Sequence, residues 1–253
     1  MKHIFSILLL TFLYISVSCA TVIEHADFAS IFHYLTPDDY HKNTVVVLDI
    51  DNTIATLGGP FQMLGSDTWV SHEIAKRIKE GMPLQEALEQ VLPLYFELVH
   101  IVDLKPAEPA TIEIIKQLQA LGITVIACTL RSLEISDRTI EQLHELGIDL
   151  THSAFGPDEI LGNDIIFRYK NGIIFCHGLS KGPAFKCVLD HFNHMPTKVI
   201  FIDDKEKYIH QIKDILHPEI EFIGIRYSQL DEKVAQFDHG VAEQELQTYL
   251  ASA

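Results

Sequence analysis

The sequence of 253 residues has little positive charge, and this shortage excludes two classes of partner. It carries 19 lysines and arginines against 35 aspartates and glutamates, which gives a formal net charge of −16. Nucleic acid and anionic membrane surfaces repel a chain of this sign, so we expect neither as a partner. The 14 histidines follow no ligand spacing such as H-E-x-x-H, and the sequence has no internal repeats or low-complexity tracts.

Cysteine is also scarce, with four residues in the whole chain. Cys19 lies near the N-terminus, and Cys128, Cys176 and Cys187 follow far downstream. An odd number in the downstream part allows at most one intramolecular disulfide, and no pair has metal-ligand spacing. Cys128 lies in an apolar run, which predicts a buried thiol. The sequence therefore predicts no disulfide scaffold and leaves the pairing open.

A long hydrophobic run occurs at the N-terminus, where residues 4–17 follow the cation of Lys2. Small residues at positions −3 and −1 favour cleavage after Ala20, so residues 1–20 are predicted to be a signal peptide. The run is short for a membrane span, although an uncleaved anchor and a lipid on Cys19 are alternatives. We expect a periplasmic or secreted protein without a stable membrane span. Loss of Lys2 leaves 18 basic residues against 35 acidic ones, a charge of −17.

The mature chain of about 230 residues suits one large domain or a core with a small inserted one. Short β-branched runs alternate in it with segments of helical spacing. This alternation predicts an α/β fold, a three-layer Rossmann-like parallel sheet with helices on both faces. The expected strands are residues 45–50, 123–128, 198–202 and 221–225, and the expected helices are 108–121, 135–146, 183–192 and 206–216.

Two segments interrupt the alternation. Residues 56–104 contain amphipathic stretches near 71–79 and 84–99, which predict a small helical cap inserted after the first strand. The core then comprises residues 21–55 and 105–253. Residues 165–176 predict a β-hairpin, because Asn-Gly lies between two β-branched runs.

Acidic residues follow the predicted strands. Asp49 and Asp51 end the first strand with one residue between them, so in an extended chain both side chains project from the same face. Open parallel sheets bind ligands in the crevice outside this carboxyl edge. Acids in such a place need a divalent cation or backbone amides to offset their burial. The spacing therefore predicts a polar site at this edge.

Four motifs in order resemble those of the haloacid dehalogenase-like (HAD) phosphotransferases. The first is a D-x-D-x-T sequence after the first strand, and the second is a threonine that ends the second strand. A lysine then opens the third helix, and a pair of acids ends the third strand. The matching segments are Asp49-Ile50-Asp51-Asn52-Thr53, Ala127-Cys128-Thr129, Lys181 and Ile202-Asp203-Asp204.

The resemblance implies a role for each motif. Asp49 would attack phosphorus and form an aspartyl phosphate, and Asp51 would act as general acid and base. Thr129 and Lys181 would bind the phosphoryl oxygens. Lys186 lies too far around the helix from Lys181 to share this role.

The resemblance also implies a magnesium ion (Mg2+), which prefers six oxygen ligands. The oxygens would come from Asp49, the main-chain carbonyl of Asp51, and Asp203 or Asp204. An acid at the position of Asp51 is typical of phosphatases and phosphomutases in this superfamily. The implied function is therefore a magnesium-dependent phosphomonoester hydrolase that acts on a small phosphorylated substrate outside the cytoplasm.

Within the superfamily, the chain fits an exported bacterial branch of unknown function. It is distantly similar to the class C acid phosphatases, in which a glutamate occupies the position of Asn52. Two alternatives stay open: a non-catalytic exported binding or interaction protein on the same scaffold, and a phosphotransferase that uses an alcohol as acceptor.

Three side chains near these motifs have two interpretations each. Arg131 would contact a substrate phosphate or pair with a surface acid. Trp69 would anchor the cap or cover a substrate. His177, a few residues before Lys181, would touch substrate or lie on the surface.

Overall fold

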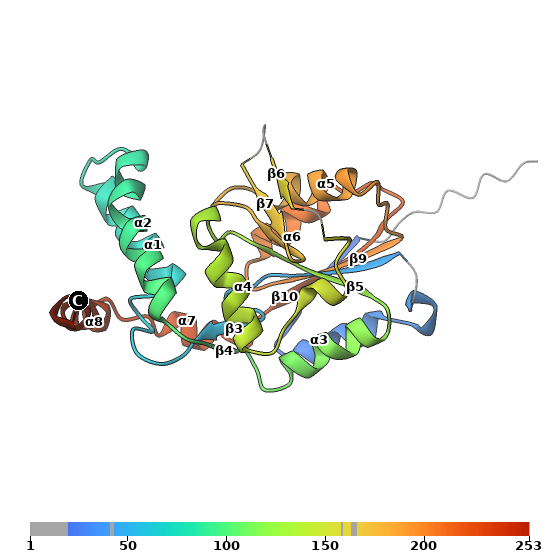
Figure 1. Cartoon of the computed structure of the whole chain (residues 1–253), viewed down its shortest axis with the longest axis horizontal. Coiled ribbons are helices and arrows are strands. Elements are labelled where there is room, and N and C mark those ends of the chain that lie inside the picture. Colours follow the sequence, from blue (N-terminus) through green and yellow to red (C-terminus); the bar gives the residue numbers. More distant parts are fainter. Residues whose placement is uncertain (1–19, 41–42, 158, 163–165, 253) are drawn as a thin grey trace, which may run out of the picture.

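An eight-stranded sheet runs through the molecule between two layers of helices (Figure 1). The computed structural model describes residues 20–40, 43–157, 159–162 and 166–252. In spatial order the strands are β1 (Ala20–His25), β10 (Glu221–Tyr227), β9 (Lys198–Asp203), β2 (Thr44–Leu48), β5 (Thr124–Thr129), β8 (Ile173–Phe175), β7 (Arg168–Lys170) and β6 (Ile160–Leu161).

The strands from β1 across to β8 pair in parallel, and β7 and β6 continue antiparallel. This arrangement confirms the predicted α/β class. The helices are α1 (Asp67–Lys79), α2 (Leu84–Ile101), α3 (Thr111–Ala120), α4 (Ser136–Glu145), α5 (Lys181–His191), α6 (Glu206–Lys213), α7 (Asp231–Ala235) and α8 (His239–Ser252). Short 3-10 helices span Phe28–Tyr34, Pro37–Asp39, Leu133–Ile135 and Leu150–His152.

Alternate residues of the central strands pack into two different cores. In β2, Val45 and Val47 face a cluster that includes α5 and α6, whereas Val46 and Leu48 face one that includes α3, α4 and the 3-10 helix Phe28–Tyr34. Successive side chains of a strand point to opposite faces, so a strand covered on both sides must be apolar throughout. This is the physical reason for the β-branched runs in the sequence.

Two strands of the eight-stranded sheet were not predicted from the sequence. The dipeptide β6 extends the hairpin, and β1 pairs in parallel with β10 at the edge of the sheet. The predicted signal peptide lies outside the described residues except for Ala20, which opens β1 opposite Phe222. A cut after Ala20 therefore leaves the rest of β1, residues 21–25, in the mature chain. The predicted hairpin is present as β7 and β8, with positive φ at Asn171 (51°) and Gly172 (77°).

A second, smaller sheet forms the base of a helical insertion. β3 (Ala55–Leu57) pairs antiparallel with β4 (Leu104–Pro106), and α1 and α2 lie between them in sequence. The C-terminal helix α8 packs on this insertion in a third hydrophobic cluster that contains Trp69, Leu98 and Ala242. Figure 1 shows α1, α2 and α8 together at one end of the molecule. The sequence did not predict that α8 joins these helices.

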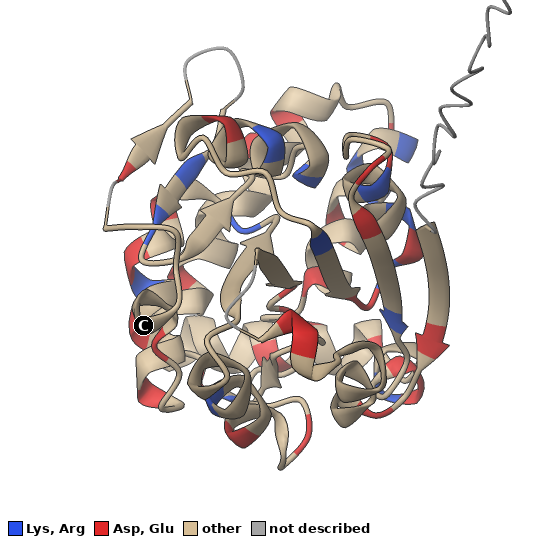
Figure 2. Ribbon diagram, turned by 90° about the vertical axis from the view of Figure 1, so that its right-hand side faces the viewer, with Lys and Arg blue, Asp and Glu red and all other residues tan. Residues whose placement is uncertain are grey.

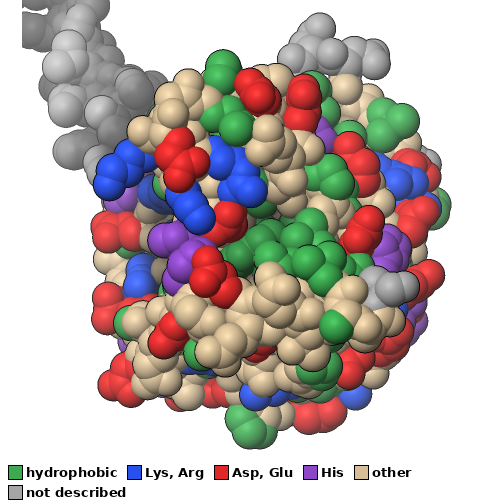
Figure 3. Space-filling view, turned by 90° about the vertical axis from the view of Figure 1, so that its left-hand side faces the viewer, with side chains coloured by type: hydrophobic (Ala, Val, Ile, Leu, Met, Phe, Trp, Pro, Cys, Tyr) green, Lys and Arg blue, Asp and Glu red, His purple; other side chains and the backbone are tan. Residues whose placement is uncertain are grey.

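Charged and hydrophobic side chains lie in different parts of the molecule. Charged residues of both signs lie mainly on the helices and loops, around central strands that are mostly uncharged (Figure 2). Hydrophobic side chains gather near the middle of the face that bears α1, α2 and α8 (Figure 3). No helix among the described residues has the length and apolar character that crossing a membrane requires.

Candidate active site

The register of two neighbouring strands brings two of the predicted acids together. Leu48 of β2 pairs with Ile202 of β9, so Asp49 and Asp203 are the next residues at the carboxyl edge of the sheet. The amide of Asp49 donates a hydrogen bond of 2.9 Å to the carbonyl of Ile202. Both carboxylates are buried. The sheet itself therefore positions this pair.

Lys181 joins the two acids. As the first residue of α5, it is fully buried, and its Nζ donates to Asp49 Oδ1 at 2.6 Å and to Asp203 Oδ2 at 2.7 Å. Its backbone amide donates to Gln211 Oε1 on α6 at 3.0 Å. A Cβ on Gly182 would lie 2.2 Å from the carbonyl oxygen of Gln211. Glycine at this position thus lets α5 begin close enough to α6 to place the lysine.

Lys186, the other lysine of α5, lies elsewhere. Its Nζ pairs with Asp190 at 2.6 Å, and both side chains are more than half exposed. The structure therefore separates the two lysines as the helix period predicted, with Lys181 at the acids and Lys186 in solvent.

The electrostatics of the acids reflect their crowding. Burial raises the pKa of Asp49 well above its usual value, and the neighbouring carboxylates raise it further although Lys181 acts in the opposite direction. Burial also disfavours the charged form of Lys181, but Asp203 and Asp49 outweigh it and raise the pKa of the ammonium group. The positive charge of this one lysine therefore does not offset the negative charges of the acids around it.

Three of these acids form a group that suits a metal. One oxygen each from Asp49, Asp203 and Asp204 lie within 4.8 Å of one another. Burial and the neighbouring Asp203 raise the pKa of Asp204 to about 7, although Lys205 opposes the shift. Carboxylate oxygens are the ligands that Mg2+ prefers, and a divalent cation would relieve the repulsion that raises these pKa values. The residues present therefore fit a magnesium ion.

Asp51 has a different partner. β2 ends at Leu48, and a turn in which Asn52 has φ 61° carries Asp51 into an isolated bridge with Ala55. The extended geometry assumed from the sequence thus stops before Asp51. Its two oxygens accept hydrogen bonds of 2.8 and 2.9 Å from the guanidinium group of Arg131. Burial acts to raise the pKa of Asp51, but Arg131 outweighs it and holds that pKa below its usual value.

Arg131 also connects the site to the helical insertion. Its Nη1 donates to Thr139 Oγ1 at 3.1 Å and to Gln142 Oε1 at 2.8 Å. The Gln142 amide in turn donates to the carbonyls of Val99 and Val102, both at 3.0 Å. These carbonyls lie at the end of α2, so a buried chain of hydrogen bonds runs from Asp51 to the insertion. Arg131 thus pairs with one of the predicted site acids, Asp51, and not with a surface acid.

Thr129 lies at the end of β5, next to the first motif. Its Oγ1 accepts a hydrogen bond of 3.2 Å from the Arg131 amide, and its own hydroxyl hydrogen can be donated to another acceptor.

The residue before Thr129, Cys128, is buried as predicted, and its sulfur lies 3.6 Å from that of Cys176. Burial raises the pKa of the Cys128 thiol, which keeps it protonated. His177 contacts Ser132 Oγ at 2.9 Å.

A pocket beside Asp51 is lined by the insertion and by the C-terminal segment. Lys233 of α7 lines it and donates to Thr56 Oγ1 at 2.8 Å, and Phe237 and Met63 supply apolar surface. Asp67, at the start of α1, also lines the pocket and forms an ion pair with Lys205 of the core. The sequence did not single out these residues, because no local motif marks them.

Tyr95 of α2 is a further residue of this region that the sequence missed. Burial and the nearby charge of Asp51 raise the pKa of its hydroxyl. Trp69, by contrast, is buried in the third hydrophobic cluster, which is the anchoring position. Only the three-dimensional structure brings Tyr95 and Asp51 together.

Comparison with solved structures finds a distant likeness. A haloacid dehalogenase-like hydrolase from Streptococcus pneumoniae shares 14% sequence identity over 77% of this chain and 98% of its own, with a TM-score of 0.42.

Comparison with known sequences finds closer relatives. A protein of Chlamydia pneumoniae named "Putative outer membrane protein" is 30% identical over 87% of this chain and 83% of its own. A protein of the same name from Chlamydia trachomatis is 24% identical over 86% of this chain and 82% of its own. A family model described as "Protein of unknown function (DUF2608)" matches residues 24–252. The chain belongs to this DUF2608 family.

Proposed function

We propose that the protein is a magnesium-dependent phosphomonoesterase of the HAD type, which works through an aspartyl phosphate on Asp49. One observation carries this proposal: Lys181, Asp49 and Asp203 meet in a buried group at the carboxyl edge of a parallel sheet. Phosphoryl transfer needs positioning and neutralisation of charge on the phosphoryl oxygens, and this group supplies a nucleophile, a cation and metal ligands in one place.

The first step begins with Asp49. Lys181 holds its Oδ1, which leaves Oδ2 to attack phosphorus. A bond forms between Oδ2 and phosphorus, and the bond from phosphorus to the leaving oxygen breaks. Asp51 gives its proton to that oxygen, so an alcohol departs. Lys181 and the Thr129 hydroxyl would bind two of the phosphoryl oxygens during the transfer.

The second step needs Asp51 as a base. It takes a proton from water, the water oxygen bonds to phosphorus, and the bond to Asp49 breaks to release inorganic phosphate. The ion pair with Arg131 favours the ionised form of Asp51, which suits this step. The first step requires the protonated form, so the proposal includes a weakening of the Asp51–Arg131 contact when substrate binds.

Asp49, Asp203, Asp204 and the main-chain carbonyl of Asp51 would hold the magnesium ion. When bound, the ion would neutralise negative charge on the phosphoryl group and on the acids around it. Both oxygens of Asp203 already accept hydrogen bonds, from Lys181 Nζ and from the Lys205 amide. Asp203 is therefore held in place as a ligand by its neighbours.

The leaving group would occupy the pocket beside Asp51. The pocket offers one cation, Lys233, and the apolar side chains of Met63 and Phe237. Burial lowers the pKa of Lys233, and Lys105 lowers it further. This lining suits a small substrate with both an apolar part and a polar or anionic part. Specificity would then depend on the insertion and on the C-terminal segment together.

An extracytoplasmic location completes the proposal. It is supported by the predicted signal peptide over residues 1–20 and by the names of the chlamydial relatives, which refer to the outer membrane.

The test is release of inorganic phosphate by the chain from Thr21 onward, assayed with p-nitrophenyl phosphate, nucleotides and sugar phosphates. We expect turnover that requires magnesium and falls by at least about a thousandfold in Asp49→Asn. Asp190→Asn, which alters an exposed acid on α5, should leave the rate unchanged. An added alcohol acceptor that captures the phosphate would indicate a phosphotransferase. A folded, magnesium-binding chain that hydrolyses no member of the panel would favour the non-catalytic scaffold.

A further inference from the structure

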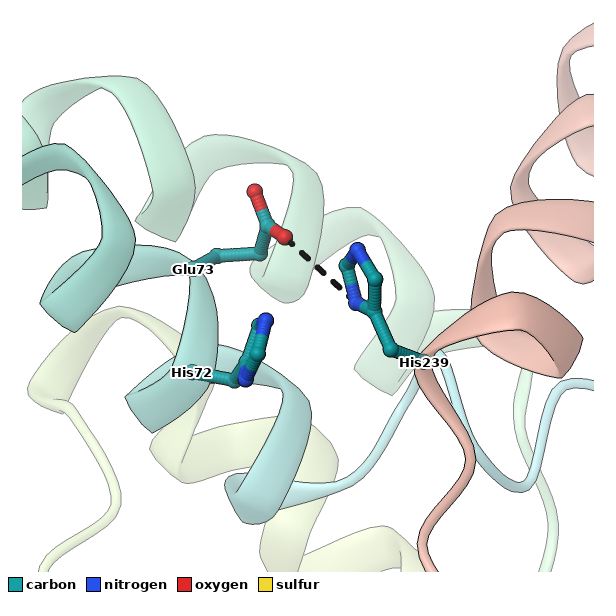
Figure 4. A group of neighbouring side chains, drawn as sticks. All are labelled: His72, Glu73 and His239. Atoms are coloured by element: carbon teal, nitrogen blue, oxygen red, sulfur yellow. Dashed lines mark ion pairs between the residues drawn. The ribbon is translucent and has the colours of Figure 1, made fainter.

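A second group of potential metal ligands lies away from the acids at the sheet edge. His72 and Glu73 of α1 and His239, the first residue of α8, each direct one ligand atom into a space in which these atoms lie within 4.8 Å of one another (Figure 4). Figure 4 shows the three side chains converging from the two helices. Two imidazoles and one carboxylate form a different donor set from the all-oxygen group of Asp49, Asp203 and Asp204.

One neighbour of His239 is a carboxylate. Its Nε2 lies 3.2 Å from Glu243 Oε1, one turn further along α8. This approach is within ion-pair distance but is not a hydrogen bond, and it leaves the other ring nitrogen, Nδ1, on the side of Glu73. That Nδ1 is buried and has no hydrogen-bond partner among the described residues. A carboxylate behind a histidine is the usual outer-shell support of a metal ligand.

Glu73 is oriented in the same way. Its Oε2 accepts a hydrogen bond of 2.6 Å from Arg77 Nη1, and its Oε1 lies 3.8 Å from Nδ1 of His239. This separation is too long for a hydrogen bond. Two ligand atoms at about 2.1 Å from a tetrahedral zinc ion lie about 3.4 Å apart. Small side-chain rotations would therefore bring Glu73 Oε1 and His239 Nδ1 to the separation that zinc requires.

His72 completes the set. Its ring lies 4.4 Å, centroid to centroid, from the ring of His239, at an interplanar angle of 36°. The two rings are therefore close enough for one ion to meet a nitrogen of each.

We propose that His72, Glu73 and His239 bind one divalent transition-metal ion, for which Zn2+ fits best, and that this ion fastens the C-terminal helix α8 to α1 of the insertion. Imidazole ligands select zinc over magnesium, and three protein ligands leave a fourth position for water. The site joins segments that are far apart in the sequence and lies next to the third hydrophobic cluster, because the ring of His72 lies 6.1 Å, centroid to centroid, from that of Phe237. Its role is to hold α8 against α1, whose first residues, Asp67 and Thr68, line the pocket beside Asp51.

The competing explanation is a protonated His239 held between Glu73 and Glu243 without a metal. It predicts the same resting geometry but no affinity for zinc. The two explanations therefore differ in a binding measurement, which does not depend on enzymatic activity.

The experiment is a calorimetric titration of the chain from Thr21 onward with Zn2+ in excess magnesium. We expect one equivalent to bind, to persist in Asp203→Asn and to weaken at least tenfold in His72→Ala and His239→Ala. Glu243→Gln, which keeps the packing of α8, should weaken binding about tenfold through the orientation of His239. His210→Ala is the matched control, because His210 and Glu206 form a similar pair at 3.3 Å without further ligands in the described group.

A second readout is hydrogen exchange with and without zinc. We expect zinc to slow exchange in α1 and α8 of the wild-type chain and to have no such effect in His239→Ala. Absence of zinc binding by the folded wild-type chain would overturn the proposal, as would equal affinity in wild type, His72→Ala and His239→Ala. Loss of the equivalent in Asp203→Asn alone would assign the zinc to the sheet edge and would also overturn it.

Discussion

The site at the sheet edge and the cluster formed by α1, α2 and α8 are built in different ways. At the edge, adjacent strands fix Asp49 and Asp203, and Lys181 between them is fully buried. The helical cluster has a small buried centre around Trp69 and Leu98, and many of its other hydrophobic members are partly exposed. The first region therefore resists local change, whereas the second has less packing to hold it together.

Polar contacts join the two regions. Gln142 bonds the end of α2, and Lys205 pairs with Asp67. Under the proposed function, a rigid acidic site beside a more loosely held pocket would let specificity vary without disturbing the chemistry. The following predictions test this contrast.

The largest effect is expected from Lys181→Met. The substitution leaves Asp49 and Asp203 buried without their cation, which should lower the free energy of unfolding by about 3–5 kcal/mol. Lys186→Met on the same helix removes an exposed pair and should change it by less than about 0.5 kcal/mol. Urea denaturation at pH 7 measures both. Similar losses in the two variants would show that the buried group contributes no more than a surface pair.

The next prediction compares two leucines that are both fully buried, Leu48 in the main core and Leu98 in the helical cluster. Replacement of either leucine by alanine should lower the free energy of unfolding of the region that contains it by about 2–5 kcal/mol. Leu48→Ala should accelerate hydrogen exchange throughout the sheet. Leu98→Ala should accelerate it in α1, α2 and α8 and leave β2, β5 and β9 protected. Global acceleration in Leu98→Ala would mean that the two regions unfold as one.

A smaller effect is expected from Gly182→Ala. The new Cβ would lie 2.2 Å from the Gln211 carbonyl oxygen, a clash that should cost about 1–3 kcal/mol and displace Lys181. Gly240→Ala in α8 meets only Asp238 Oδ1, at 3.2 Å, an atom that accepts a hydrogen bond from the Val241 amide, and should change the stability by less than about 1 kcal/mol in either direction. Thermal unfolding of the two variants provides the comparison. Equal tolerance at both positions would contradict the tight contact between α5 and α6.

Much of the sheet could be predicted from the sequence, because burial on both faces demands the uninterrupted apolar runs of β2, β5, β9 and β10. The meeting of Asp49, Lys181, Asp203 and Asp204 follows from the same logic, since parallel strands end at one edge. Their catalytic roles stay a prediction, as do the boundaries of the core and cap.

Other features depend on tertiary contacts that no local pattern contains. Arg131 has two chemically reasonable partners in the sequence, and only the fold brings Asp51 to its guanidinium group. α8 has weak amphipathic character, so its packing on Trp69 was not visible. His72 and His239 lack any ligand spacing because they lie far apart in the sequence.

The proposed chemistry is tested most directly by trapping the phosphorylated enzyme. Asp51→Asn removes the base of the second step, and p-nitrophenyl phosphate needs no proton for its leaving group, so the first step should proceed and the second should stall. After mixing with magnesium and an acid quench, the protein should gain the mass of one phosphoryl group on the peptide that contains Asp49. Phosphate release without this adduct, or release that persists in Asp49→Asn, would contradict Asp49 as the nucleophile.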